Sequence, residues 1–245
     1  MTTGSEWLSS LPEQPGKERD QAVIEAAKSG LLHCDWVPIK STYKDHEATF
    51  YVCDDALYVD LDDGSRFRPQ CTALMNQEIA DALGASMITA KISDLSYLQA
   101  DVVLDAQPLP AGPDMVTTTK SKQYNALVEK KRADRTGLIR DCGKAWILHN
   151  NVVSVVQGAR GAVNYGFYSK SSPYVAQYSG LKLWQQNSYK HNIGHQDYSQ
   201  TIILMSKECV IDDIETTIDS VVAHPELSFL MNYEGPLKYT RQPGV

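Results

Sequence analysis

The sequence predicts an α+β protein with a helical N-terminal half and a small β-meander, packed on a mainly antiparallel C-terminal sheet. Apolar residues recur at helical spacing in several segments before residue 134, whereas short apolar or aromatic runs separated by Gly, Asn and Ser dominate after Gly137. The chain has 245 residues and is 42% hydrophobic. This length allows one large core or two small ones.

The N-terminal half begins with residues 1–15, whose prolines, glycine, serines and threonines predict an irregular arm. Apolar residues at helical spacing, closed by Gly30, predict the first helix. Two β-rich runs separated by Asp54-Asp55, followed by a turn at residues 62–64 that leads into Phe67, predict the meander. The expected elements are a helix over 17–29, strands over 48–53 and 56–61, and helices over 72–83 and 89–100.

A proline-rich stretch between residues 101 and 114 cannot hold a helix and predicts an extended surface crossing. After the arm, we expect residues 16–245 to form a single domain or two lobes, 16–105 and 115–245, joined at this crossing. A further helix is expected over 117–133, where the basic run 130–132 suits the negative end of the helix dipole.

Beyond Gly137, the apolar and aromatic runs predict a second sheet or barrel. A last helix is expected from Ile211 to Ala223, because its acidic start suits a helix N-terminus and Pro225 marks a stop. The expected strands are 145–148, 152–156, 162–168, 181–184 and 201–205.

The charge balance bears on partners and location. Lys and Arg number 23 against 30 Asp and Glu, so no general nucleic-acid footprint is expected. No apolar run approaches the ~18 residues of a membrane span, and residues 1–20 have neither a basic start nor an apolar segment. We therefore expect no membrane span and no signal peptide, and a location in a virion or the cytoplasm.

Five scattered cysteines include no CxxC pair, which disfavours both a zinc cluster and a complete disulfide framework. His191 and His195 could bind a metal together on a helix, with Asp197 as third ligand, but Gly194 argues against a helix there. We expect no metal and no other cofactor.

The densest polar cluster lies just before the apolar run at 201–205. His191 would be the general base, Asp197 would orient it and Ser199 would be the nucleophile. The alternative is a tight loop whose polar side chains cap backbone groups. Around this candidate catalytic set, the expected binding residues are Tyr189, Asn192, His195, Tyr198 and Trp184.

A second possible nucleophile is Cys142, with His191 as base and Asp197 as third member, in the order found in papain-like peptidoglycan peptidases. Those enzymes place the cysteine at a helix N-terminus, which lowers the thiol pKa. Here an apolar β-like run follows Cys142. A buried structural thiol is therefore the preferred interpretation.

Aromatic residues are concentrated in the β-rich half and suit a core, a carbohydrate-stacking surface or a protein interface. A strand presents both of its faces, so we expect some of these side chains to be exposed. They are Trp146, Tyr165, Phe167, Tyr168, Tyr174, Tyr178, Trp184 and Tyr189.

Several segments in one order resemble a family of bacterial proteins, often exported, that has no assigned activity. They include 36–38, 79–84, 115–117, 137–148, 191–192, 197–199, 224–227 and 234–237. The chain departs from the family at two histidines. Relatives read Gly-His-Lys-Lys-Asp where this chain has residues 141–145 (DCGKA), and Asp-Tyr-Ser-His-Gly where it has residues 197–201 (DYSQT).

The replaced histidines and the aromatic C-terminal half favour a structural or interaction component of a larger assembly, such as a phage virion protein. Its partners would be other protein subunits of that assembly. The alternative is a hydrolase acting on cell-envelope glycan or peptide through His191, Asp197 and Ser199. The export of the relatives motivates the glycan as a further partner.

Overall fold

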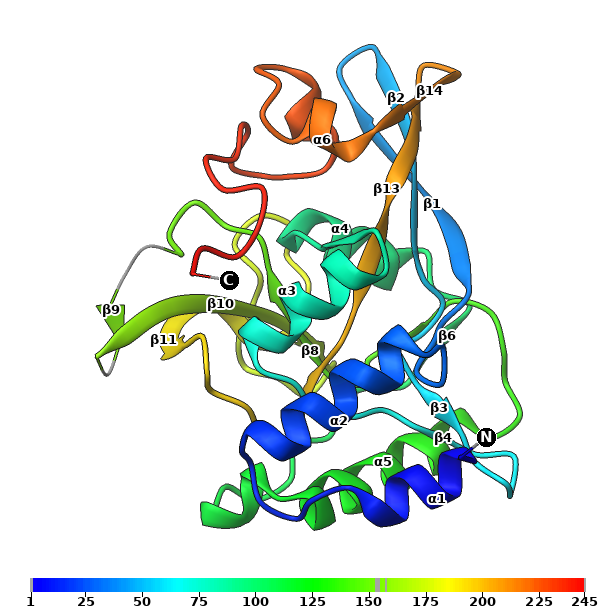
Figure 1. The fold of residues 1–245 in the computed structure, drawn as a ribbon. Helices are drawn as coiled ribbons and strands as arrows, with labels where there is room; N and C mark the ends of the chain where they lie inside the picture. The colour runs from blue at the N-terminus through cyan, green and yellow to red at the C-terminus, as the bar shows by residue number, and fades with distance from the viewer. Residues whose placement is uncertain (1, 153–154, 157, 245) are drawn as a thin grey trace.

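The computed structural model describes residues 2–152, 155–156 and 158–244, which form a mixed α/β fold (Figure 1). The helices of this described part are α1 (Gly4–Ser10), α2 (Lys17–Lys28), α3 (Ala73–Ala82), α4 (Ala90–Leu98), α5 (Thr118–Arg132) and α6 (Ile218–Val221). Short 3₁₀ turns lie at Pro113–Val116 and Leu227–Leu230.

The strands fall into two five-stranded sheets and two small ribbons. The first sheet has the order β1-β2-β13-β14, with β5 on β13; the second has the order β11-β10-β8-β12, with β9 on β10. The ribbons are β3-β4 and β6-β7. The bounds are β1 (Trp36–Tyr43), β2 (His46–Cys53), β3 (Val59–Asp60), β4 (Arg66–Phe67), β5 (Ala85–Met87), β6 (Val102–Val103), β7 (Ile139–Arg140), β8 (Lys144–Ile147), β9 (Val155–Val156), β10 (Ala159–Tyr168), β11 (Leu183–Asn192), β12 (Gln200–Thr201), β13 (Leu204–Ile211) and β14 (Ile214–Thr217).

The predicted division into a helical N-terminal half and a C-terminal sheet is wrong. α6 lies in the second half of the described chain, whereas β1, β2 and β5 belong to the first. β13 pairs with β2 on one side and β14 on the other, so both halves build one sheet (Figure 1). Alternating apolar residues mark β2 as a strand, but they do not specify which distant strand completes its hydrogen bonding.

The expected meander is also different. β2 pairs with β1 in a hairpin running from Trp36↔Cys53 to Tyr43↔His46, and the small ribbon β3-β4 stands apart from it. Ala48, Phe50 and Val52 of β2 are buried, as the alternation of a strand requires. The prediction for 152–156 covers residues 153–154, which lie outside the described residues.

The predicted helix over 211–223 is wrong in its first half. β13 continues to Ile211 and turns through Asp212 and Asp213, which adopt left-handed φ angles of 49° and 64°. Aspartate tolerates this conformation and favours the tight turn of a hairpin, so the acidic pair ends a strand. Only Ile218–Val221 are helical.

The segment expected to be an irregular arm contains α1. Thr3 and Glu6 form a reciprocal capping box, in which each side chain accepts the backbone N–H of the other residue. Trp7 is buried, and its indole nitrogen donates to the carbonyl of Ala22 in α2. These contacts attach α1 to the rest of the fold.

The helices predicted at 17–29, 72–83, 89–100 and 117–133 are confirmed as α2, α3, α4 and α5. The last three begin after Thr72, Thr89 and Thr117, whose side chains accept a backbone N–H of the first turn. The Pro-rich crossing runs through β6 without a helix until Pro113.

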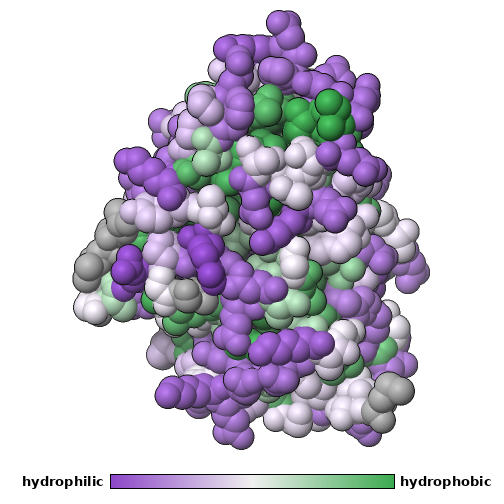
Figure 2. Space-filling view, turned by 45° about the horizontal axis from the view of Figure 1, so that its top comes forward, coloured by the Kyte–Doolittle hydropathy of each residue, from purple (hydrophilic) through white to green (hydrophobic). Residues whose placement is uncertain are grey.

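Figure 2 shows a mostly hydrophilic face with an apolar area in its upper part. Within the described residues, no helix is both long and apolar enough to cross a membrane.

Candidate functional site

The structure brings the predicted cluster together at the end of β11 and in the turn before β12. Asp197 is its centre: the carboxylate is buried and lies 2.9 Å from Nζ of Lys144. The hydroxyl of Ser199 donates to Oδ1 of Asp197 at 2.6 Å, and the Ser199 backbone N–H donates to the same oxygen at 2.9 Å. Burial alone would raise the pKa of Asp197, but His195, Lys144 and Ser199 hold it well below its ordinary value.

The two imidazoles of the cluster stack on each other. The ring centroids of His191 and His195 are 4.0 Å apart with nearly parallel planes. Burial, together with His195 and Lys144, lowers the pKa of His191 to about 4. Nε2 of His195 lies 3.7 Å from Oδ2 of Asp197. The imidazole beside Asp197 is therefore His195 rather than His191.

This arrangement does not direct the Ser199 proton to an imidazole, because the hydroxyl donates to a carboxylate. A nucleophilic serine needs a neighbouring base that takes its proton. Ser199 is also only 3% exposed. The contacts match those of a turn in which Asp197 caps backbone and side-chain donors.

The other predicted binding residues divide between two places. Tyr198 accepts the backbone N–H of Leu109 and donates to its carbonyl, so it holds the Pro-rich crossing. Asn192 accepts the backbone N–H of Gly194. Tyr189 and Trp184 lie in the groove described below.

Two segments that the sequence resemblance singles out, residues 141–145 and 197–201, lie side by side. β12 pairs in parallel with β8, with Gln200 opposite Lys144 and Thr201 opposite Ala145. Lys144 thus reaches Asp197 from the neighbouring strand. The resemblance treats these two segments as separate motifs, but in the fold they are neighbours, because β8 and β12 pair with each other.

Cys142 is 1% exposed, and burial together with Asp55 raises its pKa to about 12. A neutral buried thiol is a poor nucleophile. For metal binding, no group of three or more His, Cys, Asp or Glu side chains within the described residues could hold an ion.

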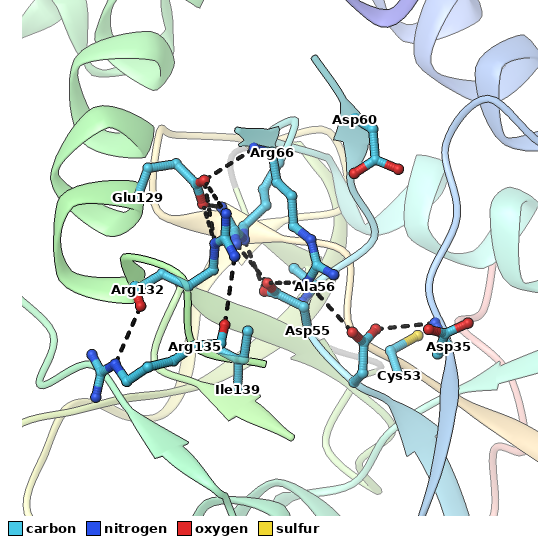
Figure 3. A network of polar contacts seen from close by, with 12 residues as sticks. Asp35, Cys53, Asp55, Ala56, Asp60, Arg66, Glu129, Arg132, Arg135 and Ile139 are labelled. Carbon is cyan, nitrogen blue, oxygen red and sulfur yellow. Dashed lines mark hydrogen bonds and ion pairs between the residues drawn. The ribbon is translucent and has the colours of Figure 1, made fainter. Parts of the chain in front are cut away.

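A second polar cluster lies between α5 and the loop after β2. Arg68 contacts Asp55 on one side, with Nε 2.8 Å from Oδ1, and Glu129 of α5 on the other, with Nη1 2.7 Å from Oε1. Figure 3 shows Glu129 facing the loop that carries Asp55, with Arg66 beside them. Arg68 is 4% exposed and Asp55 fully buried. These partnered charges join α5 to the loop after β2.

The hollowed surface with aromatic walls lies along β11. One hollow of ≈ 480 Å³ is lined by Tyr174 and residues 184–190. A neighbouring hollow of ≈ 210 Å³ is lined by Tyr165, Tyr178, Gln177 and Ala90, and shares three residues with the first. We call the two hollows together the β11 groove; the shared residues are Gln186, Asn187 and Tyr189.

His149 holds one wall of this groove from behind. It is 4% exposed, and its Nε2 lies 3.1 Å from the hydroxyl of Tyr189 and 3.3 Å from Nδ2 of Asn187. The backbone N–H of Asn151 lies 3.1 Å from Nδ1. Glu234 lies 3.3 Å from Nδ1. Burial lowers the pKa of His149 to about 4 and raises the pKa of Glu234.

Asp94 of α4 holds the opposite wall. Its carboxylate is fully buried and accepts hydrogen bonds from the hydroxyls of Tyr165 and Tyr233 at 3.0 Å each. Tyr178, which is 52% exposed, stacks on Tyr233 with ring centroids 4.9 Å apart. Tyr189 on one wall and Tyr165 on the other are therefore fixed by buried polar groups.

Sequence reasoning identified Tyr189 and Trp184 but missed His149, Glu234 and Asp94. His149 follows a predicted strand as the first of three polar residues, and its partners come from β11 and from the C-terminal segment. The histidine directly after an apolar run was the only local signal.

Comparisons with protein-family models, with curated proteins and with solved structures give no match for this chain. The resemblance to the bacterial family therefore stays a prediction.

Proposed function

We propose that this protein is an interaction protein that binds a glycan chain of the cell envelope in the β11 groove. One observation carries the proposal: aromatic rings and side-chain amides line the groove together, with the exposed Tyr174 and the half-buried Trp184 beside Gln186. Sugar rings pack on aromatic faces, and their hydroxyl groups hydrogen-bond to amides.

The composition of the walls supports a saccharide. Tyr174 and Tyr178 are about half exposed and present ring faces on which a sugar ring can pack. The amides of Gln177, Gln186 and Asn187 both donate and accept hydrogen bonds, as do sugar hydroxyls. Tyr189 and Tyr165 are fixed by His149 and Asp94, so these two side chains need little ordering on binding.

Sedimentation with purified, insoluble cell-wall sacculi tests the proposal. Wild-type protein should move to the pellet, and Trp184→Ala and Tyr178→Ala should each reduce the bound fraction at least tenfold. Trp36→Ala is the matched control, because Trp36 is a 41% exposed aromatic residue on β1. Binding that is absent in the wild type, or equal in Trp184→Ala, would contradict the proposal.

Binding in the groove is compatible with a component of a larger assembly such as a phage virion. The replacement of both family histidines supports an interaction role over a catalytic one. Solution sizing of the purified chain and mass spectrometry of the particles from its source test this membership. A stable lone monomer that is absent from every particle would exclude it.

The hydrolase hypothesis has a separate test. The hydrogen bond from Ser199 to Asp197 does not favour it, because no base receives the serine proton. Loss of turbidity of the same sacculi measures hydrolysis. Activity that is present in the wild type and lost in both Ser199→Ala and His191→Ala would support the hydrolase instead.

A further inference from the structure

The β11 groove has a charge pattern that differs from that of the whole chain. The chain carries a net charge of −7. Yet no carboxylate is among the described residues that line either hollow of the groove, and Lys190 lies at one end of it. Beyond the other end, a third hollow of ≈ 370 Å³ is lined by Lys170 and Lys182, together with Tyr97. It too has no acidic residue in its wall.

These lysines are free to meet a ligand. Lys170, Lys182 and Lys190 are exposed, and no ion pair with a carboxylate is formed by any of them within the described part of the chain. Nζ of Lys182 contacts the backbone carbonyl of Lys170, so these two lysines are neighbours on the surface. Lys182 and Lys190 are eight residues apart, which corresponds to at most roughly 26 Å, because β11 is irregular where it pairs with β10.

We infer that the β11 groove takes an extended acidic saccharide, a chain of sugars with repeated carboxylates that reaches from Lys182 to Lys190. The inference rests on the proposed function and adds the class of glycan. The aromatic faces and amides between the lysines pack against and hydrogen-bond to the sugar rings, and the lysines pair with carboxylates at both ends of the saccharide. A neutral glycan would leave the cations unused, and a cationic one would be repelled by them.

A single-stranded nucleic acid also combines negative charge with flat rings. The structure favours the saccharide over this polyanion. The groove wall is rich in amides that match hydroxyls, and arginine, the usual stacking cation for bases, is absent from the described lining residues. The experiment therefore includes an oligonucleotide as a separate arm.

Affinity electrophoresis and titration calorimetry of the full chain use three probes: polygalacturonate, a neutral β-glucan and a single-stranded oligonucleotide. Polygalacturonate should bind at least tenfold more tightly than the other two, and its affinity should fall as salt is raised from 50 to 300 mM. The variant Lys182→Ala/Lys190→Ala should lose at least tenfold in affinity. Lys122→Ala, which removes an exposed charge from α5, should bind like the wild type.

The outcomes separate this inference from the proposed function. Equal binding of β-glucan and polygalacturonate, with loss in Trp184→Ala, would overturn the acidic class and leave the glycan groove standing. Binding of the oligonucleotide alone would overturn both. If the protein binds neither saccharide and does not bind the sacculi, the proposed function itself is wrong. An unchanged melting curve of the double lysine variant shows that a lost affinity is not a loss of folding.

Discussion

Lys144 and Asp197 form an ion pair of 2.9 Å whose side chains are only 10% and 5% exposed. Lys144 belongs to β8, and Asp197 belongs to the turn that leads into β12. The pair therefore lies where the two strands meet in parallel. Taking both charges out of water is costly, and each charge depends on its partner for compensation.

Asp197→Ala should destabilise the protein by about 3–5 kcal/mol, because it leaves Lys144 buried without a counter-charge and removes the acceptor of Ser199. Thermal melts at neutral pH measure the loss. Adding Lys144→Met should recover part of it, since the unpaired charge is then gone. An unshifted melt of Asp197→Ala would refute the structural role of this carboxylate.

His149 should make stability depend on pH between about 6.5 and 4. Its pKa is about 4 in the fold, below the ordinary 6.5, so its neutral form is favoured in the folded state. This stabilisation is complete above pH 6.5 and is lost as pH falls towards 4. At pH 4.5 the free energy of unfolding should be lower by about 2 kcal/mol than at neutral pH. Denaturant unfolding at pH 7 and 4.5 measures the difference.

His149→Gln should lose less stability than the wild type between those two pH values, because glutamine does not titrate. His33→Gln is the control, since the His33 side chain is 41% exposed and lies outside the groove. If His149→Gln loses as much as the wild type over this range, His149 is not the group responsible.

Arg68→Met should destabilise the protein by about 3–5 kcal/mol, because Asp55 and Glu129 then lose a shared partner at a buried site. Arg68→Lys should recover little, since one ammonium cannot reproduce the planar fork that contacts both carboxylates. Arg135→Met, at an exposed position beside the same network, should stay within about 0.5 kcal/mol of the wild type. Equal melts of Arg68→Met and Arg135→Met would exclude this stabilising role.

Gly143→Ala should destabilise the contact between β8 and β12. A Cβ at this position would lie 2.6 Å from the carbonyl oxygen of Ser199 and 2.6 Å from Cγ2 of Thr201. Relief of such overlap by moving the backbone costs roughly 1–3 kcal/mol. In the control Gly194→Ala, the nearest atom would be 3.5 Å away. Chemical denaturation of both variants compares them, and equal midpoints would show that the strands accommodate the methyl group.

Local signals in the sequence were sufficient where the structure depends on neighbours along the chain. Thr72, Thr89 and Thr117 cap helices that were predicted within one or two residues, because capping and amphipathic spacing act within a single turn. The acidic pair at Asp212 and Asp213 was misinterpreted for a related reason. An acidic residue suits both a helix start and a left-handed turn, and the hairpin partner of β13 decides between them.

By itself, the sequence determined most of the helices and several of the strands, and it singled out Tyr189 and Trp184, which line the groove. Only the tertiary structure decided that β2 pairs with β13, and that His149 meets Tyr189 and Glu234 behind the groove wall. The physical reason is the same in both cases. Unpaired strand edges and buried polar atoms must find partners, but many distant groups could satisfy them, and the packing of the whole chain selects one.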